Sequence, residues 1–330
     1  MITMSRLGTH GQFGNQVFQY AFIRTYARRH AISYQLPPWV GQYLFGHRDP
    51  PLTLKFDPSI ERLGPSRHEL GYGMPIPPGG EHVGRDWSGW GQYHTSWYRP
   101  DKDFIQSLFQ IQEVLRPPLQ AAWQNLRSRG KTIVGLHLRR GDSGRAIFFF
   151  TPIVWCLRWL RENWPRLDEP VLFLATESLE LKRFFAAYHV LTVEDLGIEL
   201  KPEVPPAYVY PHRVGRDRVR QLDFLPDWWL LQQCPIVLAS ESTFSFSAAW
   251  TGTACREFWR PRLLLRGFER LDPWDTETSP REHLDDFPGI PGTQIDSNLE
   301  FPEAWKEFRP TYPSVPEDEA EIAKWMEPPK

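Results

Sequence analysis

Cysteine is scarce in this chain of 330 residues, which contains only Cys156, Cys234 and Cys255. The three lie far apart without a CxxC pair, so the sequence offers neither a disulfide framework nor a Cys-based zinc site. HExxH and P-loop motifs are also missing, as are Cys/His clusters at ligand spacing. We therefore expect no metal site, and the few cysteines favour a reducing compartment.

Long hydrophobic runs are missing as well. The most apolar stretch, residues 146–160, is interrupted by Pro152 and Arg158 and is shorter than a membrane-spanning helix requires. The first residues lack the charged-then-apolar pattern of a signal peptide. We expect a cytoplasmic protein without a transmembrane segment, and leave open peripheral contact with a membrane surface.

The net charge of −2 conceals an uneven distribution. Residues 269–330 carry 16 acidic and six basic side chains together with ten prolines, whereas residues 1–268 carry a charge of +8. A positive body suits an anionic ligand, although an ordinary surface explains it equally well. The C-terminal segment is predicted to be an acidic, Pro-rich extension.

The most informative stretch is VGLHLRRGD at residues 134–142. An apolar, alternating strand pattern ends in two adjacent arginines, Arg139 and Arg140, where a glycine lets the chain turn. Ligands of open α/β sheets bind at the carboxyl ends of strands, and paired guanidiniums suit a phosphate or diphosphate. The alternative, a strand end where Asp142 pairs with one arginine, stays open.

Strands alternate with helices from about residue 131 to 265, which is typical of a parallel, doubly wound sheet. A Gly-bearing turn at 11–16 precedes an amphipathic helix at 17–30, within a more irregular first α/β region. We expect three parts: an N-terminal α/β domain at 1–125, a Rossmann-like domain at 126–268 and the extension at 269–330.

Three segments of the second domain share the order strand, polar turn, helix; their strands are predicted at 132–138, 171–175 and 236–239. In one parallel sheet these turns lie at the same edge and converge. Ser242, Thr243 and Ser245, with the N–H groups of a helix start, suit phosphate oxygens, and Glu177 suits a ribose or a base edge. Helix capping for the hydroxyls and a first-turn acid for Glu177 are the structural alternatives.

Several segments together resemble a known family. They are GQFGNQVFQYA at 11–21, GWGQY at 89–93, HLRRGD at 137–142 and the block at 227–250 that contains STFS. In this order they resemble the motifs of α-1,2-fucosyltransferases, glycosyltransferase family eleven, and PPW at 37–39 is similar to the related protein O-fucosyltransferases. The match extends over about residues 6–260.

The resemblance implies an α/β fold of the GT-B type, with two Rossmann-like domains facing each other across a cleft. It implies inverting, metal-independent transfer of fucose from GDP-fucose to a hydroxyl of an oligosaccharide or polysaccharide, without a cofactor and without a nucleic-acid partner. Arg139 and Arg140 would bind the diphosphate and stabilise the departing GDP, as a metal does elsewhere. The other residues implied to bind the donor are Asn15, Gln16, His137, Glu177, Ser242, Thr243 and Ser245.

The chain departs from the family pattern at two motifs. Ala175-Thr176-Glu177 stands where Ser-Asp-Asp is usual, and ESTFSFS at 241–247 stands where Asn-Ser-Ser-Phe-Ser-Trp-Trp is usual. The walls of the donor pocket therefore differ. Two alternatives stay open: a glycosyltransferase with another GDP-sugar donor, and an inactive homologue that binds a glycan or a nucleotide.

An aromatic and polar loop in the first domain is a candidate acceptor platform, because sugar faces stack on aromatic rings; a packed loop is the structural alternative. The acceptor residues predicted there are Asp86, Trp90, Tyr93 and His94.

An inverting transfer needs a base for the acceptor hydroxyl. The candidates are Asp142, Asp86, Glu177 and His94, and we place Asp142 in the catalytic set with Arg139 and Arg140. A role for Asp142 as a brace for an arginine stays open.

Asp101-Lys102-Asp103 matches the DxD pattern of metal-dependent glycosyltransferases. It follows Pro100 at the start of an expected helix, which favours helix capping over a metal site.

Overall fold

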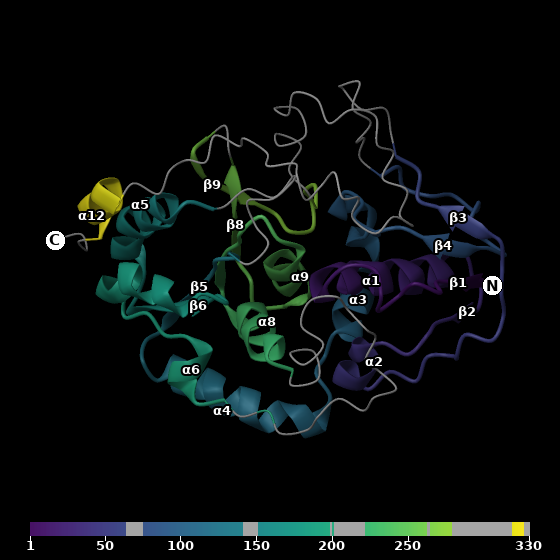
Figure 1. Ribbon diagram of the computed structural model, residues 1–330, viewed down its shortest axis with the longest axis horizontal. Helices are drawn as coiled ribbons and strands as arrows, with labels where there is room; N and C mark the ends of the chain where they lie inside the picture. Colours follow the sequence, from purple (N-terminus) through teal and green to yellow (C-terminus); the bar gives the residue numbers. More distant parts are fainter. Residues whose placement is uncertain are drawn as a thin grey trace, which may run out of the picture.

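The computed structural model describes residues 1–63, 75–140, 151–198, 200, 222–262, 265–278 and 319–326. Two α/β halves lie side by side along the longest axis of the molecule (Figure 1). Each half has its own sheet, and all strands but one run parallel to their neighbours. The expected fold class, two Rossmann-like α/β halves, is confirmed.

The first sheet consists of four short strands in the order β2-β1-β4-β3. They are β1 (Ile2–Thr3), β2 (Tyr34–Gln35), β3 (Pro58–Ile60) and β4 (Asp86–Ser88). Helix α1 (Phe13–Arg29) follows β1 and is buried along most of its length, because apolar and aromatic residues occupy nearly every side of it. It begins four residues before the predicted start at 17, so Asn15 lies in its first turn rather than in the preceding loop.

The second sheet has five strands in the order β6-β5-β7-β8-β9, of which β9 is antiparallel. They are β5 (Thr132–His137), β6 (Pro170–Ala175), β7 (Ile236–Leu238), β8 (Glu257–Arg262) and β9 (Gly267–Leu271). The predicted strands agree with β5, β6 and β7 to within one residue at each end, whereas β8 and β9 were not predicted.

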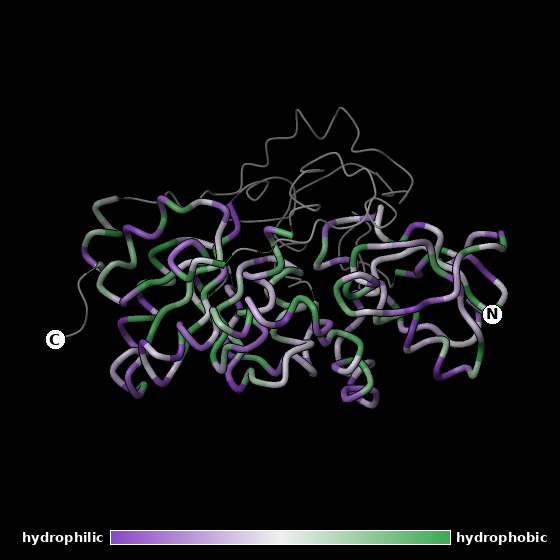
Figure 2. The backbone as a smooth tube through the Cα atoms, turned by 90° about the horizontal axis from the view of Figure 1, so that it is seen from below, coloured by the Kyte–Doolittle hydropathy of each residue, from purple (hydrophilic) through white to green (hydrophobic). Residues whose placement is uncertain are grey.

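Helices cover both faces of this sheet. Val134 and Leu136 of β5 pack into one core cluster and Ile133 into another, because successive side chains of a strand point to opposite faces. Helix α5 (Ile153–Asn163) lies on the first face, and α8 (Phe224–Gln233) and α9 (Thr243–Thr251) lie on the second. Hydrophobic segments accordingly run through both halves of the chain (Figure 2).

The strand order reverses between β5 and β7. The chain passes from β5 to β6 on one side, then crosses to β7 on the other side of β5. The helices that follow β5 and β7 therefore leave toward opposite faces, which separates the two turns at the carboxyl edge. Such a switch point is where ligands bind in open α/β sheets.

The two halves share one hydrophobic core rather than meeting only at polar surfaces. Phe18 of α1 stacks on Trp250 of α9, with ring centroids 4.8 Å apart, and Phe13 packs edge-on against Trp228 of α8 at 5.3 Å. At Gly14 a β-carbon would lie 2.5 Å from the backbone nitrogen of Phe244. Only glycine allows the first turns of α1 and α9 to approach this closely.

The remaining helices and 3-10 turns surround the two sheets. They are α2 (Val40–Phe45), α3 (Lys102–Leu108), α4 (Arg116–Arg127), α6 (Val193–Leu196), α12 (Glu319–Trp325), and the 3-10 elements Thr95–Trp97, Arg99–Asp101, Glu113–Leu115, Trp164–Arg166 and Leu179–Tyr188. Helix α4 runs across residue 125 and β9 across residue 268, so both expected domain boundaries fall within regular elements. These boundaries stay a prediction.

Candidate active site at the junction of the two halves

His137 ends β5 and connects it to the turn after β7. Its Nδ1 lies 2.7 Å from Ser240 Oγ and 2.9 Å from Ser245 Oγ. Burial, together with the nearby charges of Arg139 and Arg140, lowers the pKa of His137 to about 3, so the imidazole is neutral near pH 7. Ser245 is fully buried, and its hydroxyl is engaged by His137. The side chains of His137 and Ser245 therefore fit a structural role, in which they connect the end of β5 to the start of α9.

Arg139 and Arg140 follow β5 after Leu138 and are half-buried. The guanidinium of Arg140 donates to the carbonyl oxygens of Arg139 at 3.2 Å and Thr151 at 3.1 Å, which fixes its direction. Its backbone N–H donates to the carboxylate of Glu177. Glu177 thus holds the backbone at Arg140 from the end of β6, a role that the sequence did not indicate.

Asp142, the remaining member of the predicted catalytic set, lies outside the described residues. Its assignment as base or as brace is therefore unchanged by the structure.

Ser242 and Thr243 begin α9 and make different contacts. Ser242 is the N-cap, and its Oγ accepts a hydrogen bond from the N–H of Phe244 at 3.2 Å, as the capping alternative predicted. The Thr243 hydroxyl instead donates across the junction to Oδ1 of Asn15 at 2.9 Å. The same oxygen accepts from Nε2 of Gln92 at 2.9 Å, so Asn15 joins both halves.

The first turns of α1 and α9 therefore meet at the junction. Neither first turn contains an acidic residue. Each helix N-terminus carries a partial positive charge, and two such ends together favour an anion, although Ser242 already accepts the N–H of Phe244 in α9. Arg139 and Arg140 stand two and three residues beyond His137, whose ring contacts this same turn. Both guanidiniums act electrostatically on His137, so their charge lies close to the turn that leads into α9, while Glu177 beside Arg140 and Glu241 before Ser242 offset part of it.

Gln16 is buried and shapes the loop before α1. Its Nε2 donates to the carbonyl oxygens of Gly8 at 3.2 Å and Gly11 at 3.1 Å. Gln19, one turn further, donates to the carbonyls of His10 and Gly89 at 3.1 and 3.3 Å. Two glutamines in the apolar first half of α1 were the available signal for this bracing, and Gln19 was not among the predicted site residues.

The four predicted acceptor residues do not form one surface. The carboxylate of Asp86 accepts from Thr3 Oγ1 at 2.8 Å and from the Ser5 hydroxyl at 2.6 Å, which ties β4 to the end of β1. Tyr93 is fully buried, so a direct acceptor contact is wrong for it, and the packed-loop alternative holds there.

Trp90 and His94 are half-buried, like Asp86, but their side chains are not tied to β1. The Trp90 ring packs against His10 in a tilted arrangement, with centroids 3.8 Å apart. His94 lies 4.0 Å from Asp275, and its Nδ1 is 2.7 Å from the Ser96 hydroxyl. These two remain the acceptor candidates.

A segment after β9, which was not predicted from the sequence, crosses from the second half back to the first. We call residues 272–278 the strap. The Thr95 hydroxyl donates to the carbonyl of Thr276 and accepts from its N–H, both at 2.9 Å. The Thr278 hydroxyl donates to the carbonyl of Gln92 at 2.6 Å. The strap therefore fixes the loop that reaches Asn15.

A buried ion pair holds the strap on the second half. Arg260 of β8 lies 3.7 Å from the carboxylate of Glu241, and its Nη2 donates to the carbonyl of Thr278 at 3.1 Å. Both ionic side chains are less than 9% exposed. Glu241, which departs from the family motif, thus serves the attachment of the strap.

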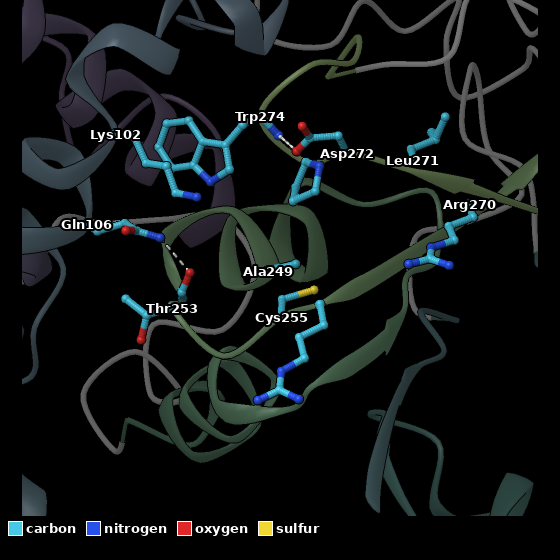
Figure 3. A pocket seen from close by; sticks show the side chains of 12 residues that line it. Lys102, Gln106, Ala249, Thr253, Cys255, Arg270, Leu271, Asp272 and Trp274 are labelled. Atoms are coloured by element: carbon cyan, nitrogen blue, oxygen red, sulfur yellow. Dashed lines mark hydrogen bonds between the residues drawn. The ribbon is translucent and has the colours of Figure 1, made fainter. Parts of the chain in front are cut away.

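A pocket of about 450 Å³ lies at the other end of α9, between α3 and the start of β8 (Figure 3). None of the predicted site residues lines it. Because α9 has nine residues, the pocket is roughly 13 Å along the helix from the Thr243 end. It is therefore separate from the candidate site.

Within the described ranges, no group of three or more His, Cys, Asp or Glu side chains is arranged to hold a metal ion. Asp101 of the DxD pattern occupies the N-cap position of α3 without capping it through its side chain. Its Oδ2 accepts from Nε of Arg29 at 2.7 Å instead. The capping interpretation was therefore wrong about the bond that this carboxylate makes.

No helix among the described residues has the length and apolar character needed to cross a membrane.

No protein-family model and no curated protein matches the chain. Among solved structures, NodZ α-1,6-fucosyltransferase soaked with GDP-fucose is similar at 15% identity over 82% of this chain and 97% of that one, with a TM-score of 0.44. The fucosyltransferase NodZ from Bradyrhizobium is similar at 14% identity over 83% of this chain and 96% of that one, with a TM-score of 0.44. A mutant of Arabidopsis thaliana FUT1 in complex with GDP is similar at 10% identity over 84% of this chain and 74% of that one, with a TM-score of 0.49. With similarity this low, the activity has to be argued from the site itself.

Proposed function

We propose that this chain is a metal-independent glycosyltransferase that binds the diphosphate of GDP-fucose at the junction and transfers fucose to a glycan hydroxyl. One observation carries the proposal: the first turns of α1 and α9 touch, and neither contains an acid that would offset its positive end. Arg139 and Arg140 follow the strand that contacts the same turn. The motif resemblance to α-1,2-fucosyltransferases supports the choice of donor.

Charge explains how these groups would act. When the bond between fucose and GDP breaks, negative charge accumulates on the leaving diphosphate. Donors held in place before the reaction stabilise this charge without reorganisation. The carbonyls of Arg139 and Thr151 hold the Arg140 guanidinium, so this cation is pre-oriented. We assign it and Arg139 the role that a metal ion plays in other transferases.

The proposal extends to an inverting, α-1,2-type transfer onto an oligosaccharide or polysaccharide in the cytoplasm. Among the described base candidates, Glu177 and His94 reach solvent, whereas the carboxylate of Asp86 is held by Thr3 and Ser5. Trp90 offers an aromatic face beside the junction for the acceptor.

Titration calorimetry with GDP, GDP-fucose, GDP-mannose, UDP and ADP, each with and without a chelator, tests the donor. We expect the guanine nucleotides to bind, the chelator to have no effect, and UDP and ADP to bind at least about tenfold more weakly. Failure of every guanine nucleotide to bind would refute the proposal. Tighter binding of GDP-mannose would favour another GDP-sugar donor.

Transfer to a panel of glycan acceptors then tests activity. Arg139→Ala and Arg140→Ala should each lower the rate about thirtyfold, or about 2 kcal/mol. Arg85→Ala is the matched control, because this exposed arginine pairs with Asp57 away from the junction. If GDP binds but no acceptor accelerates its release, the chain is a binding protein that retains the fold.

A further inference from the structure

Glu61 is a buried carboxyl group directly after β3, with 7% of its surface exposed. It accepts hydrogen bonds from the backbone N–H groups of Trp90 at 3.2 Å and Gly91 at 3.0 Å. No cation in the described part of the chain pairs with it, because the adjacent Arg62 forms its ion pair with Glu81. The carboxylate is therefore stabilised by hydrogen bonds alone.

The backbone that Glu61 holds belongs to the 89–92 loop, which borders the junction. Trp90 packs against His10, and Gln92 donates to Asn15, the residue that also contacts α9. Gly91 has φ +65°, and a β-carbon there would lie 2.9 Å from the Phe18 carbonyl. The loop is thus pressed against α1 on one side and tied to Glu61 on the other.

We propose that Glu61 is a positioning residue that latches the 89–92 loop against the junction, and that its ionisation loosens the loop. The link to donor binding rests on the proposed function, whereas the latch itself does not.

Desolvation determines the direction of the effect. A carboxylate buried without a counter-ion is costly, so the closed loop favours the protonated group. Burial raises the pKa of Glu61 to about 7, against the opposing effect of the two backbone N–H groups and the Tyr93 hydroxyl. Between the ordinary pKa of 4.5 and this raised value, opening returns the carboxyl group to water and releases its proton, so opening becomes progressively easier as the pH rises and levels off above about pH 7.

Other ionisable side chains surround this position on each neighbouring element. They are Tyr93 and Tyr98, Arg29 of α1, Arg62, Glu81 and His82, and His10 beneath Trp90. Burial raises the pKa of both tyrosines and lowers that of His82. A substitution at Glu61 alone is therefore needed to assign the titration.

Amide hydrogen exchange at Trp90 and Gly91 tests the latch without any activity measurement. In the unaltered chain, exchange corrected for the intrinsic rate should accelerate by up to about tenfold per pH unit between about pH 5 and 7 and level off above pH 7. Glu61→Gln, which cannot ionise, should lose this acceleration, and the control Glu81→Gln should keep it. A flat profile in the unaltered chain, or an unchanged slope in Glu61→Gln, would overturn the latch. Since the first measurement needs no substitution, a flat profile overturns the latch even if the variant fails to fold.

GDP titration at pH 5.5 and 7.5 tests the link to the donor site. The loss of affinity with rising pH should be at least about fivefold greater in the unaltered chain than in Glu61→Gln. If the exchange pattern holds but GDP binds at neither pH, the proposed function fails and the latch stands. If GDP binds with the same pH dependence in both chains, the loop is not part of the donor site and the link is overturned.

Discussion

Changing Asn15 to Asp should make the protein no less stable and yet weaken its binding of GDP. The Oδ1 of Asn15 accepts two hydrogen bonds at 2.9 Å, from Gln92 and from Thr243. Aspartate keeps that oxygen and adds a negative charge in the first turn of α1, beside the start of α9. A charge at a helix N-terminus contributes about 0.3–1 kcal/mol, so Asn15→Asp should unfold at equal or higher denaturant concentration.

The same charge opposes the diphosphate. A unit charge about 6 Å from one phosphate costs roughly 1–3 kcal/mol at an effective dielectric constant of about 20–40. GDP should therefore bind about 10- to 100-fold more weakly to Asn15→Asp. Asn15→Ala, by contrast, loses both hydrogen bonds and should lower the unfolding free energy by about 1–3 kcal/mol.

Urea unfolding and GDP titration on the same samples separate these effects. Asn125→Asp is the matched control, because it introduces the same charge near the C-terminal end of α4, away from the junction. It should cost a few tenths of a kcal/mol, roughly, and leave GDP binding unchanged. The reasoning is refuted if Asn15→Asp binds GDP like the unaltered chain, or loses as much stability as Asn15→Ala.

Two further predictions concern stability. His137 is neutral in the fold with a pKa of about 3, against about 6.5 when unfolded. Its contribution to the unfolding free energy is complete above pH 6.5 and should be lost at up to about 1.4 kcal/mol per pH unit as the pH falls. In urea titrations at several pH values, His137→Phe should lose that part of the pH dependence. An unchanged pH dependence would contradict the assignment. Thr95→Val removes the hydroxyl that bonds Thr276 twice, so it should cost about 1–3 kcal/mol and speed exchange of the Thr276 amide at least about tenfold, whereas Thr95→Ser should behave like the unaltered chain.

The sequence predicted β5, β6 and β7 closely because these strands are buried on both faces and end in polar turns. β8 could not be predicted in the same way. It contains Pro261 and Arg260, and a charged residue in a strand ordinarily faces solvent. Here Arg260 is buried because Glu241 and two carbonyls of the strap receive it. That arrangement depends on partners that no local pattern reveals.

For the site, the sequence identified the polar turns and not the contacts between them. Thr243 and Asn15 are 228 residues apart, and their hydrogen bond follows from the packing of α1 on α9. The aromatic loop was predicted to bind an acceptor, and several of its rings are part of the core instead. Tyr93 and Tyr98 are fully buried, as is Trp87, because they fill the core beside α1. Aromatic composition alone does not distinguish a sugar platform from packing.

The shared core changes how the junction would work. Two domains that face each other across an open cleft can close around a donor, but here Phe18 and Trp250 stack between the halves and Gly14 brings the backbones of α1 and α9 into contact. Separating the halves would expose this apolar surface, at roughly 25 cal/mol for each Å². Moving a smaller element therefore costs less free energy than separating the two halves. The 89–92 loop is such an element. Hydrogen bonds to Glu61 and Asn15 hold it, together with bonds from Gln19, Tyr98 and Thr278 to its carbonyls. Donor entry should depend on those bonds rather than on domain closure.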